Sequence, residues 1–308
     1  RPKSFEDVVG QEAIVRKVKA FVESKSLPHM LFAGSPGTGK STTALVVART
    51  LYGESWRDNF LELNGSDSRG IDTIRVEVKN FARTKSVGNH PYRIIFLDEA
   101  DALTSEAQHA LRRTMENFSN SCRFIFSVNY SSKIIEPIQS RCVVFRFKPL
   151  SNEAVLKVVK KISEKEGLRM NEKVLETILK VAEGDVRTAT NILQSAAALG
   201  KNITEENIFE ASSYANPKDI IEILNSAVGG NFVKARELTL NLMMKHGVDG
   251  LEIVKLFQKY ILELNVEEKR RLSMLEKCGE IEFRLVEGSD PFVQLQSLIA
   301  SFSKLSEG

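Results

Sequence analysis

The chain has 308 residues, of which 42% are hydrophobic and 27% charged, and its formal net charge is +3. This length exceeds a single ordinary core, so two or three globular domains are expected. The small net charge does not by itself indicate a nucleic-acid binder, and any such role depends on where the charges cluster.

The cysteines and the apolar runs exclude several classes of protein. Cys122, Cys142 and Cys278 are scattered and form no C-x-x-C pair, which argues against a zinc site or a disulfide framework and fits a reducing compartment. No signal peptide, transmembrane run or lipidation motif is found, so no membrane partner is expected. The chain starts at Arg1 without a methionine, and a short N-terminal piece is expected to be missing.

Residues 1–150 alternate strand-like apolar runs with helical stretches. The connections between successive runs are long enough for crossover helices, which predicts an α/β domain with a mainly parallel sheet. The expected strands are Met30–Ala33, Phe60–Asn64, Ile94–Leu97, Phe124–Val128 and Val143–Phe147.

The most informative run is residues 34–41, which matches G-x-x-x-x-G-K-[ST] between a strand-like run and a helical pattern. A strand, a glycine-rich turn and a helix start surround an anion with backbone N–H groups and the positive end of a helix dipole. Lys40 would reach the β and γ phosphates of a nucleotide, and the Ser41 hydroxyl would ligate magnesium. A chance glycine-rich turn is disfavoured because both flanks also match. The predicted nucleotide-binding residues of this run are Gly34, Ser35, Pro36, Gly37, Thr38, Gly39, Lys40, Ser41 and Thr42.

A helix expected from about Ile71 to Lys85 carries a basic stripe. Arg75, Lys79 and Arg83 recur at intervals of four residues, which places them on one helical face. A solvated helix face and a surface that contacts a DNA backbone explain this spacing equally well.

Residues 94–101 form the second strong signal, an apolar strand that ends in carboxylates. In a P-loop ATPase, Asp98 would hold the magnesium coordination sphere and Glu99 would polarise the attacking water. Alone, this pattern would indicate only a strand end with a capped turn. The phosphate loop upstream favours the catalytic interpretation.

Three single residues gain meaning from these motifs. Asn129 follows a predicted central strand, where ligands bind in open α/β sheets, although a turn asparagine would be the default interpretation. Arg141 precedes the last strand, and Arg187 lies near a helix start. Each would ordinarily be a surface charge, but an arginine guanidinium is well suited to a γ phosphate.

The strand signals stop after Pro149. Ser151 is a plausible cap for a helix with apolar residues at helical spacing, and further helices are expected over Val174–Ala182, over Val186–Leu199 and after Thr204. Residues 151–214 are therefore predicted to form a small helical domain. Residues 215–308 carry helical patterns after Pro217 and no chemical motif, which predicts a helical bundle used for packing or assembly.

With these motifs placed, the chain resembles AAA+ ATPases, and specifically the small subunits of replication factor C, the sliding-clamp loader. The resemblance covers essentially the whole chain, densely through residue 150 and more loosely in the C-terminal block. Ser35, where the family usually has proline, and Ser41, where threonine is commoner, both retain the required chemistry. The matching stretches are residues 98–101 (Walker B box), 140–142 (SRC motif), 28–29, 64–67, 69–71, 110–113 and 134–139, the last of which leans toward the archaeal branch.

The resemblance implies roles at the nucleotide site. Asn129 would be the sensor-1 residue that orients water or the γ phosphate, and Arg187 the sensor-2 arginine of the lid. Arg141 would be an arginine finger that acts in trans on ATP held by a neighbouring subunit, together with the catalytic residues Lys40, Asp98 and Glu99. Val8, Val9 and Gly10, with Arg1 and Pro2, would line the adenine pocket.

The resemblance also implies partners. ATP and Mg²⁺ would be the cofactors, and the assembly would be a pentamer with a large subunit and other small subunits. The ring-shaped clamp and primer–template DNA would be its substrates, with Arg69, Arg75, Lys79 and Lys133 tracking the DNA backbone without reading sequence. Arg112 and Arg113 form a second basic pair, in which Arg112 can equally pair with Glu116, and the loop 86–91 would lie near the clamp-facing surface. The expected location is cytoplasmic, on an archaeal nucleoid, or nuclear in a eukaryote.

The sequence contains features that argue against two alternatives. A branch-migration helicase would carry a C-terminal winged-helix domain with strand signals, which residues 217–308 lack. A non-catalytic assembly scaffold would have a degraded nucleotide site, whereas Lys40, Asp98, Glu99 and Arg141 are all present.

Overall fold

The computed structural model describes residues 2, 4–66, 71–88, 90–212 and 215–304, with side chains described except at 71–75, 245 and 246. Two of the predicted residues, Arg1 and Arg69, lie outside these ranges. The chain divides into two compact units, the first formed by Arg1–Gly167 with Ala182–Asn191, the second by Leu168–Val181 with Ile192–Gly308. Within the described ranges, none of the helices combines the length and the apolar composition that crossing a bilayer requires.

The first unit is built on a five-stranded parallel sheet. Its strand order is β2-β3-β4-β1-β5, which confirms the predicted α/β fold. The strands are β1 (His29–Ala33), β2 (Phe60–Asn64), β3 (Arg93–Asp98), β4 (Cys122–Val128) and β5 (Cys142–Arg146). The last strand was expected one residue later, and its successor Phe147 still donates its N–H to the carbonyl of Ala33 at 2.7 Å.

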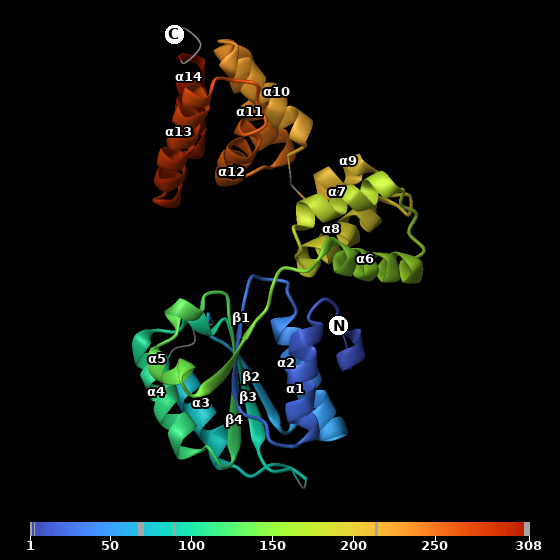
Figure 1. Ribbon diagram of the computed structural model, residues 1–308, viewed down its shortest axis with the longest axis vertical. Coiled ribbons are helices and arrows are strands. Elements are labelled where there is room, and N and C mark those ends of the chain that lie inside the picture. The colour runs from blue at the N-terminus through green and yellow to red at the C-terminus, as the bar shows by residue number, and fades with distance from the viewer. Residues whose placement is uncertain (1, 3, 67–70, 89, 213–214, 305–308) are drawn as a thin grey trace. The chain divides into compact units, whose positions relative to one another are not determined.

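The central strands β1, β3 and β4 are buried almost throughout, whereas the edge strands β2 and β5 keep exposed residues. Alternate residues of β1 point to opposite layers: Met30 and Phe32 pack with one core cluster, and Leu31 and Ala33 with the other. Helices α1 and α2 lie on one side of the sheet, and α3, α4 and α5 lie on the other (Figure 1). Their bounds are α1 Glu12–Glu23, α2 Lys40–Tyr52, α3 Ile71–Arg83, α4 Ser105–Asn117 and α5 Glu136–Gln139, with short 3-10 turns η1 Phe5–Asp7, η2 Gly53–Arg57, η3 Ala100–Ala102 and η4 Ser131–Lys133.

Helices replace strands after residue 150, as the sequence predicts. Ser151 caps α6 (Asn152–Glu166) by accepting a hydrogen bond from the N–H of Ala154 at 3.3 Å. The helices that follow are α7 (Glu172–Ala182), α8 (Val186–Leu199) and α9 (Glu205–Ser212).

The C-terminal helices of the second unit share one apolar core. Asn216 caps α10, and Pro217 occupies its first turn, where a missing N–H costs nothing. Arg270 of α13 joins the ends of two other helices, because its Nη2 donates to the carbonyl of Val228 at 2.6 Å and to that of Phe302 at 3.4 Å. These helices are α10 (Pro217–Val228), α11 (Phe232–His246), α12 (Gly250–Ile261), α13 (Glu268–Val286) and α14 (Pro291–Lys304).

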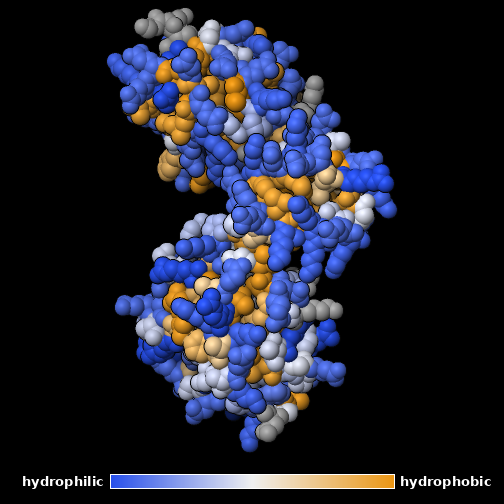
Figure 2. All heavy atoms as spheres, turned by 45° about the vertical axis from the view of Figure 1, so that its right-hand side comes forward, coloured by the Kyte–Doolittle hydropathy of each residue, from blue (hydrophilic) through white to orange (hydrophobic). Residues whose placement is uncertain are grey.

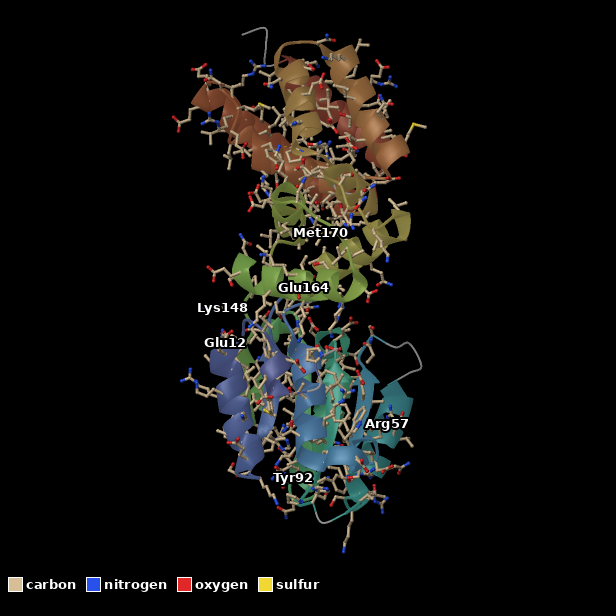
Figure 3. All side chains as sticks on the ribbon, turned by 90° about the vertical axis from the view of Figure 1, so that its right-hand side faces the viewer. Glu12, Arg57, Tyr92, Lys148, Glu164 and Met170 are labelled. Carbon is tan, nitrogen blue, oxygen red and sulfur yellow. The ribbon has the colours of Figure 1, made fainter. Side chains whose placement is uncertain are left out.

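The two ends of the sheet carry different chemistry. Glu12 and Lys148 lie at one end of the sheet domain and Tyr92 at the other (Figure 3). Because all strands are parallel, their carboxyl ends meet at the Lys148 end, where open α/β sheets bind ligands.

Candidate functional site

The glycine-rich loop lies between the carboxyl end of β1 and the start of α2. Gly34, Gly37 and Gly39 have φ values of 155°, 68° and 101°, a range that favours glycine. Gly39 occupies the capping position of α2 in the left-handed conformation with no side-chain cap. The first N–H groups of this helix are therefore directed at the loop, which makes a site for an anion.

Lys40 is only 7% exposed and lies at the centre of this loop. Its Nζ donates to the carbonyls of Gly34 and Ser35 at 2.6 and 2.8 Å and to Oδ1 of Asn129 at 3.3 Å. Burial lowers the pKa of the Lys40 ammonium, and the charges of Asp98 and Asp101 oppose this shift. A buried cation that contacts mostly neutral oxygens is suited to bind an added anion such as a phosphate.

Asp98 lies next to the loop because β3 is parallel to its neighbours. The Ser41 hydroxyl donates to Oδ2 of Asp98 at 2.7 Å. A hydroxyl and a carboxylate beside a phosphate site form a donor set that Mg²⁺ accepts, since this ion is held by few protein oxygens together with phosphates and waters. These two residues would hold the ion where the sequence predicts it.

Glu99 follows Asp98 at the same edge with an unusual backbone. Its φ is 51°, a left-handed value for a non-glycine residue, and the residue is exposed. Gly65 permits this turn, because a Cβ at Gly65 would lie 2.5 Å from the carbonyl oxygen of Glu99. The absent side chain thus lets two strand ends approach, and the Glu99 carboxylate stays at the surface of the site.

Asn129 directly follows β4, the strand beside β1, and its Oδ1 accepts a hydrogen bond from Nζ of Lys40 at 3.3 Å. The backbone of Asn129 is held by Asp101, a residue to which the sequence assigned no separate role. Oδ2 of Asp101 accepts hydrogen bonds from the N–H groups of Asn129 and Tyr130, both at 3.2 Å. Asp101 is the last residue of the acidic motif 98–101. Its place three residues after Asp98 could have suggested that it positions a neighbouring group of the site.

Two other polar residues of this region were not singled out. Gln108 is 2% exposed. Its Nε2 donates to the backbone carbonyls of Leu103 and Lys133, and its Oε1 accepts a hydrogen bond from the N–H of Ile135. It therefore ties α4 to the segment that follows β4. Gln11, 6% exposed, donates to the carbonyl of Thr38 at 3.3 Å and to that of Lys148 at 2.7 Å. Only burial, which the sequence does not show, distinguishes these glutamines from surface ones.

The start of α8 covers one side of the loop. A Cβ on Gly37 would lie 1.5 Å from Oδ1 of Asp185, so the carboxylate of Asp185 rests directly on this glycine. Asp185 caps α8 through the N–H groups of Arg187 and Thr188 at 2.7 and 3.1 Å. Arg187 is exposed, and its charge acts on Lys40.

The predicted adenine-pocket residues lie on the chain that enters α1. Val8, Val9 and Gly10 are each half-buried, and Val8 packs against the core beneath α1 and α2. Gly10 has a φ of 78°, and a Cβ at this position would lie 3.0 Å from Cγ of Leu150, so this entry segment lies close to the chain that leaves the sheet.

Arg141 lies at the opposite end of the sheet from the phosphate loop. It precedes Cys142, which pairs with His29 at the amino end of β1, whereas the loop follows the carboxyl end of β1. Along the strand direction, Arg141 and the start of the loop are six residues apart, which corresponds to about 20 Å. Glu116 of α4 holds the Arg141 guanidinium at 2.6 Å, and Glu116 also accepts from Arg112 at 3.1 Å, as predicted for this pair.

The predicted DNA contacts are only partly described. Lys79 and Arg83 are exposed on α3, and Lys133 is exposed in η4 with its Nζ 5.4 Å from the ring centroid of Tyr130. Arg75 lies in α3 at a position whose side chain is outside the described part, and Arg69 is outside it altogether.

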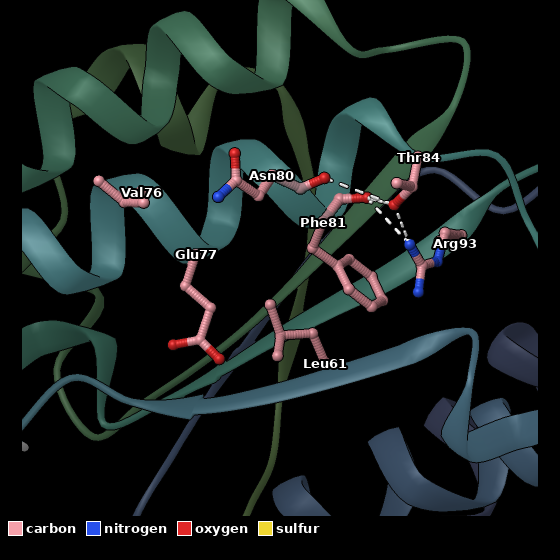
Figure 4. Close-up of a pocket in the computed structure, with 7 residues that line it drawn as sticks. All are labelled: Leu61, Val76, Glu77, Asn80, Phe81, Thr84 and Arg93. Atoms are coloured by element: carbon pink, nitrogen blue, oxygen red, sulfur yellow. Dashed lines mark hydrogen bonds between the residues drawn. The ribbon is translucent and has the colours of Figure 1, made fainter.

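A separate open pocket lies between α3 and the edge strand β2 (Figure 4). Arg93 closes one end, with its guanidinium carbon 3.5 Å from the centroid of the Phe81 ring. Its lining contains none of the predicted site residues: Leu61, Val76, Glu77, Asn80, Phe81, Thr84 and Arg93.

Comparisons with known proteins give matches along the chain. Family models match residues 30–150 (ATPase family associated with various cellular activities), 157–198 (RCF1/5-like AAA+ ATPase lid domain), 215–301 (replication factor C C-terminal domain) and 1–58 (Holliday junction DNA helicase RuvB P-loop domain). The RuvB branch migration motor of Thermotoga maritima is similar in structure, with a TM-score of 0.55 and 18% identity over 85% of this chain and 90% of that one. At this identity the likeness shows the fold alone.

Closer relatives match along the whole chain. The replication factor C small subunit of Archaeoglobus fulgidus is 48% identical over 307 residues, which cover 100% of this chain and 96% of the relative. That of Methanococcus maripaludis is 50% identical over 305 residues, covering 99% and 97%. That of Methanothermobacter thermautotrophicus is 48% identical over 306 residues, covering 98% and 95%. The chain therefore belongs to the replication factor C small subunit family of AAA ATPases.

Proposed function

We propose that this chain is a small subunit of a sliding-clamp loader, which uses ATP to open a ring-shaped clamp and load it onto primer–template DNA. The observation that carries the proposal is the position of the phosphate-loop residues and of Arg141 at opposite ends of the sheet. Lys40, Ser41, Asp98 and Asn129 gather at the carboxyl end, and Arg141 lies about 20 Å away at the amino end.

This separation supports a shared active site. An arginine at the amino end of the sheet cannot reach a phosphate held by its own loop. A neighbouring subunit packed with its amino end against this loop would supply the missing guanidinium. ATP then lies at an interface, so its binding and hydrolysis can change how two subunits fit together, as clamp opening and release require.

Each residue of the loop side has a proposed task. Lys40 and the first N–H groups of α2 neutralise and orient the phosphates, and Asn129 orients the attacking water or the γ phosphate. Glu99 accepts a hydrogen bond from that water and draws off its proton as it attacks. Bound Mg²⁺, held by Ser41 and Asp98, would neutralise charge on the phosphate oxygens.

Arg187 of the proposed lid responds to the nucleotide. Its place at the start of α8, beside the Asp185 that rests on Gly37, allows the lid to follow occupancy of the loop. We propose domain bounds of 1–150 for nucleotide binding, 151–214 for the lid and 215–308 for the oligomerisation collar. Val8 and Val9 would contact adenine.

The assembly is proposed to be a pentamer with a large subunit. The relatives are themselves named as small subunits. The described part of α13 exposes apolar residues that a neighbouring collar could bury: Leu272, Phe283 and Val286, exposed by 60, 68 and 66%. Figure 2 shows hydrophobic side chains among the charged ones of the C-terminal helices.

DNA is proposed to bind without sequence readout. Lys79 and Lys133 are exposed lysines, which suits contacts to phosphates, and Arg69 and Arg75 are proposed to join them. We propose that ATP turnover is stimulated by DNA and that the protein acts at the nucleoid of an archaeal cytoplasm, or in the nucleus of a eukaryote.

Reconstitution tests the proposal. The chain, a large subunit, the clamp, primed circular DNA and ATP are mixed, and clamps retained on DNA are counted after gel filtration. ATP-dependent retention that is lost with Lys40→Ala is expected. The matched variant Glu99→Gln should still bind ATP without turning it over. Branch migration of a four-way junction without clamp retention would contradict the proposal.

A further inference from the structure

Arg141 does not project freely from the fold. Its Nη2 donates to Oε1 of Glu116 at 2.6 Å, and its Nη1 donates to the carbonyl of Pro137 at 2.7 Å. The two acceptors belong to different elements, the last turn of α4 and the short helix α5. The guanidinium plane is thereby fixed at two points.

The Glu116 side of this contact is itself anchored. Nε of Arg112, one turn earlier in α4, donates to the same Oε1 at 3.1 Å. Leu111 and Met115 on the buried face of α4 and Ile138 of α5 belong to one core cluster, so both helices pack on the same core. The pKa of the Glu116 carboxyl is held below its usual range, chiefly by the hydrogen bond from Arg112 and also by the charges of both arginines.

The contact leaves Arg141 able to bind a phosphate. A guanidinium has five N–H donors, and the two described hydrogen bonds use only one of those on each Nη. The cluster of two arginines and one carboxylate keeps a net charge of +1, because two positive charges meet one negative charge. Glu116 therefore need not be displaced when the free edge of Arg141 meets an anion.

We propose that Glu116 is the positioning residue of the arginine finger, which holds the Arg141 guanidinium in the orientation needed by the ATP of the neighbouring subunit. The proposal rests on the proposed function, in which Arg141 acts in trans. A long arginine side chain loses rotamer freedom when it is ordered. The Glu116 and Pro137 contacts order it before the subunits meet, so less freedom is lost in the transition state.

The test uses the fully assembled complex with clamp, primed DNA, ATP and Mg²⁺. Steady-state ATP turnover is measured for Glu116→Ala, Glu116→Gln, Arg141→Ala and the double variant Glu116→Ala/Arg141→Ala. Glu136→Gln, which removes an exposed carboxylate from α5 five residues before Arg141, is the matched control. Binding of a fluorescent ATP analogue and the thermal unfolding midpoint are recorded for each variant.

Arg141→Ala should lower kcat about 10³-fold. Glu116→Ala should lower kcat about tenfold, since a misplaced catalytic group can cost up to about 10², with KM and analogue binding unchanged. Glu116→Gln keeps an acceptor oxygen and should lose no more than about fivefold. In the Arg141→Ala background, Glu116→Ala should add nothing, which a merely structural role would not produce.

The possible failures are distinguishable. If Arg141→Ala leaves turnover unchanged, the trans-finger assignment in the proposed function is wrong. If Arg141→Ala impairs turnover but Glu116→Ala matches the Glu136→Gln control, the positioning role is overturned and the proposed function stands. Equal losses from Glu116→Ala with and without Arg141 would also overturn the positioning role, because the effect would not act through the finger.

Discussion

The hydroxyl of Ser41 and the carboxylate of Asp98 are 2.7 Å apart although 57 residues separate them in the chain. Parallel pairing produces this contact. β1 and β3 lie on either side of β4, and all three strands run in the same direction. The residues at the carboxyl ends of β1 and β3 therefore lie close together. The contact joins the two strongest sequence motifs into one site and indicates how a divalent ion would be held there.

Asp98→Asn should lower ATP turnover of the assembled complex by roughly 10² or more, because the amide retains the shape but loses the charge that an ion and the transition state require. The Mg²⁺ concentration for half-maximal activity should rise in parallel. Titration of Mg²⁺ at saturating ATP measures both effects. A variant with normal Mg²⁺ dependence would contradict the assignment of Asp98.

Asp101→Ala should impair turnover without weakening ATP binding. Asp101 accepts hydrogen bonds from the backbone N–H groups of Asn129 and Tyr130, so its loss frees the segment that places the Asn129 amide. We expect kcat to fall about tenfold. Asn129→Ala should not add to this loss when combined with Asp101→Ala, whereas additive losses would show that Asp101 acts elsewhere.

Gly37→Ala should weaken ATP binding at least tenfold. The new Cβ would lie 1.5 Å from Oδ1 of Asp185, at a φ of 68° that is also unfavourable for alanine. Isothermal titration with an ATP analogue measures the loss. Adding Asp185→Ala should restore part of the affinity relative to Gly37→Ala, with Asp185→Ala alone as the control for the lost helix cap. No restoration would mean that backbone strain alone causes the defect.

The apolar runs, the long connections between them and the phosphate-loop motif predicted the parallel sheet of the first unit. Lys40, Ser41 and Asp98, which the fold brings to one end of the sheet, could be singled out because phosphate and Mg²⁺ chemistry restricts the residue types. Gln108 and Asp101 were not predicted, because their roles depend on backbone groups that only the fold brings near them. The Arg141–Glu116 contact was missed for the same reason, since Glu116 had an apparent partner in Arg112 four residues earlier.

His29 should make stability depend on pH. Its Nδ1 accepts the N–H of Phe124 at 3.0 Å, and burial, followed by the charge of Arg123, lowers the pKa of the imidazole to about 4. The unfolded chain, with a pKa near 6.5, binds the proton first, so this contribution is complete above pH 6.5 and is lost as pH falls toward 4. It amounts to about 3 kcal/mol at most.

The variant His29→Asn isolates this effect from other groups that titrate in acid. Between pH 6.5 and 4, its free energy of unfolding from denaturant titration should fall less steeply than that of the wild type. His109→Gln removes an exposed imidazole from α4 and serves as the control. Parallel curves for His29→Asn and the wild type would rule out His29 as the source.

Assembly should depend on the apolar stripe of α13. Leu272, Phe283 and Val286 recur at intervals of 11 and three residues, which places them along one helical face. Each is at least 60% exposed, and the buried face of α13 is formed by other residues, Met274, Cys278 and Ile281.

Phe283→Glu should therefore leave the thermal midpoint of the isolated chain nearly unchanged, because no described core contact is lost. A charge at a buried subunit contact would leave an unpaired, desolvated carboxylate, so subunit affinity should fall at least tenfold. Light scattering over a concentration series measures the assembly, and Glu276→Gln, about two turns before Phe283 on the same helix, is the control. Assembly as tight as that of the wild type would show that the collar uses another face.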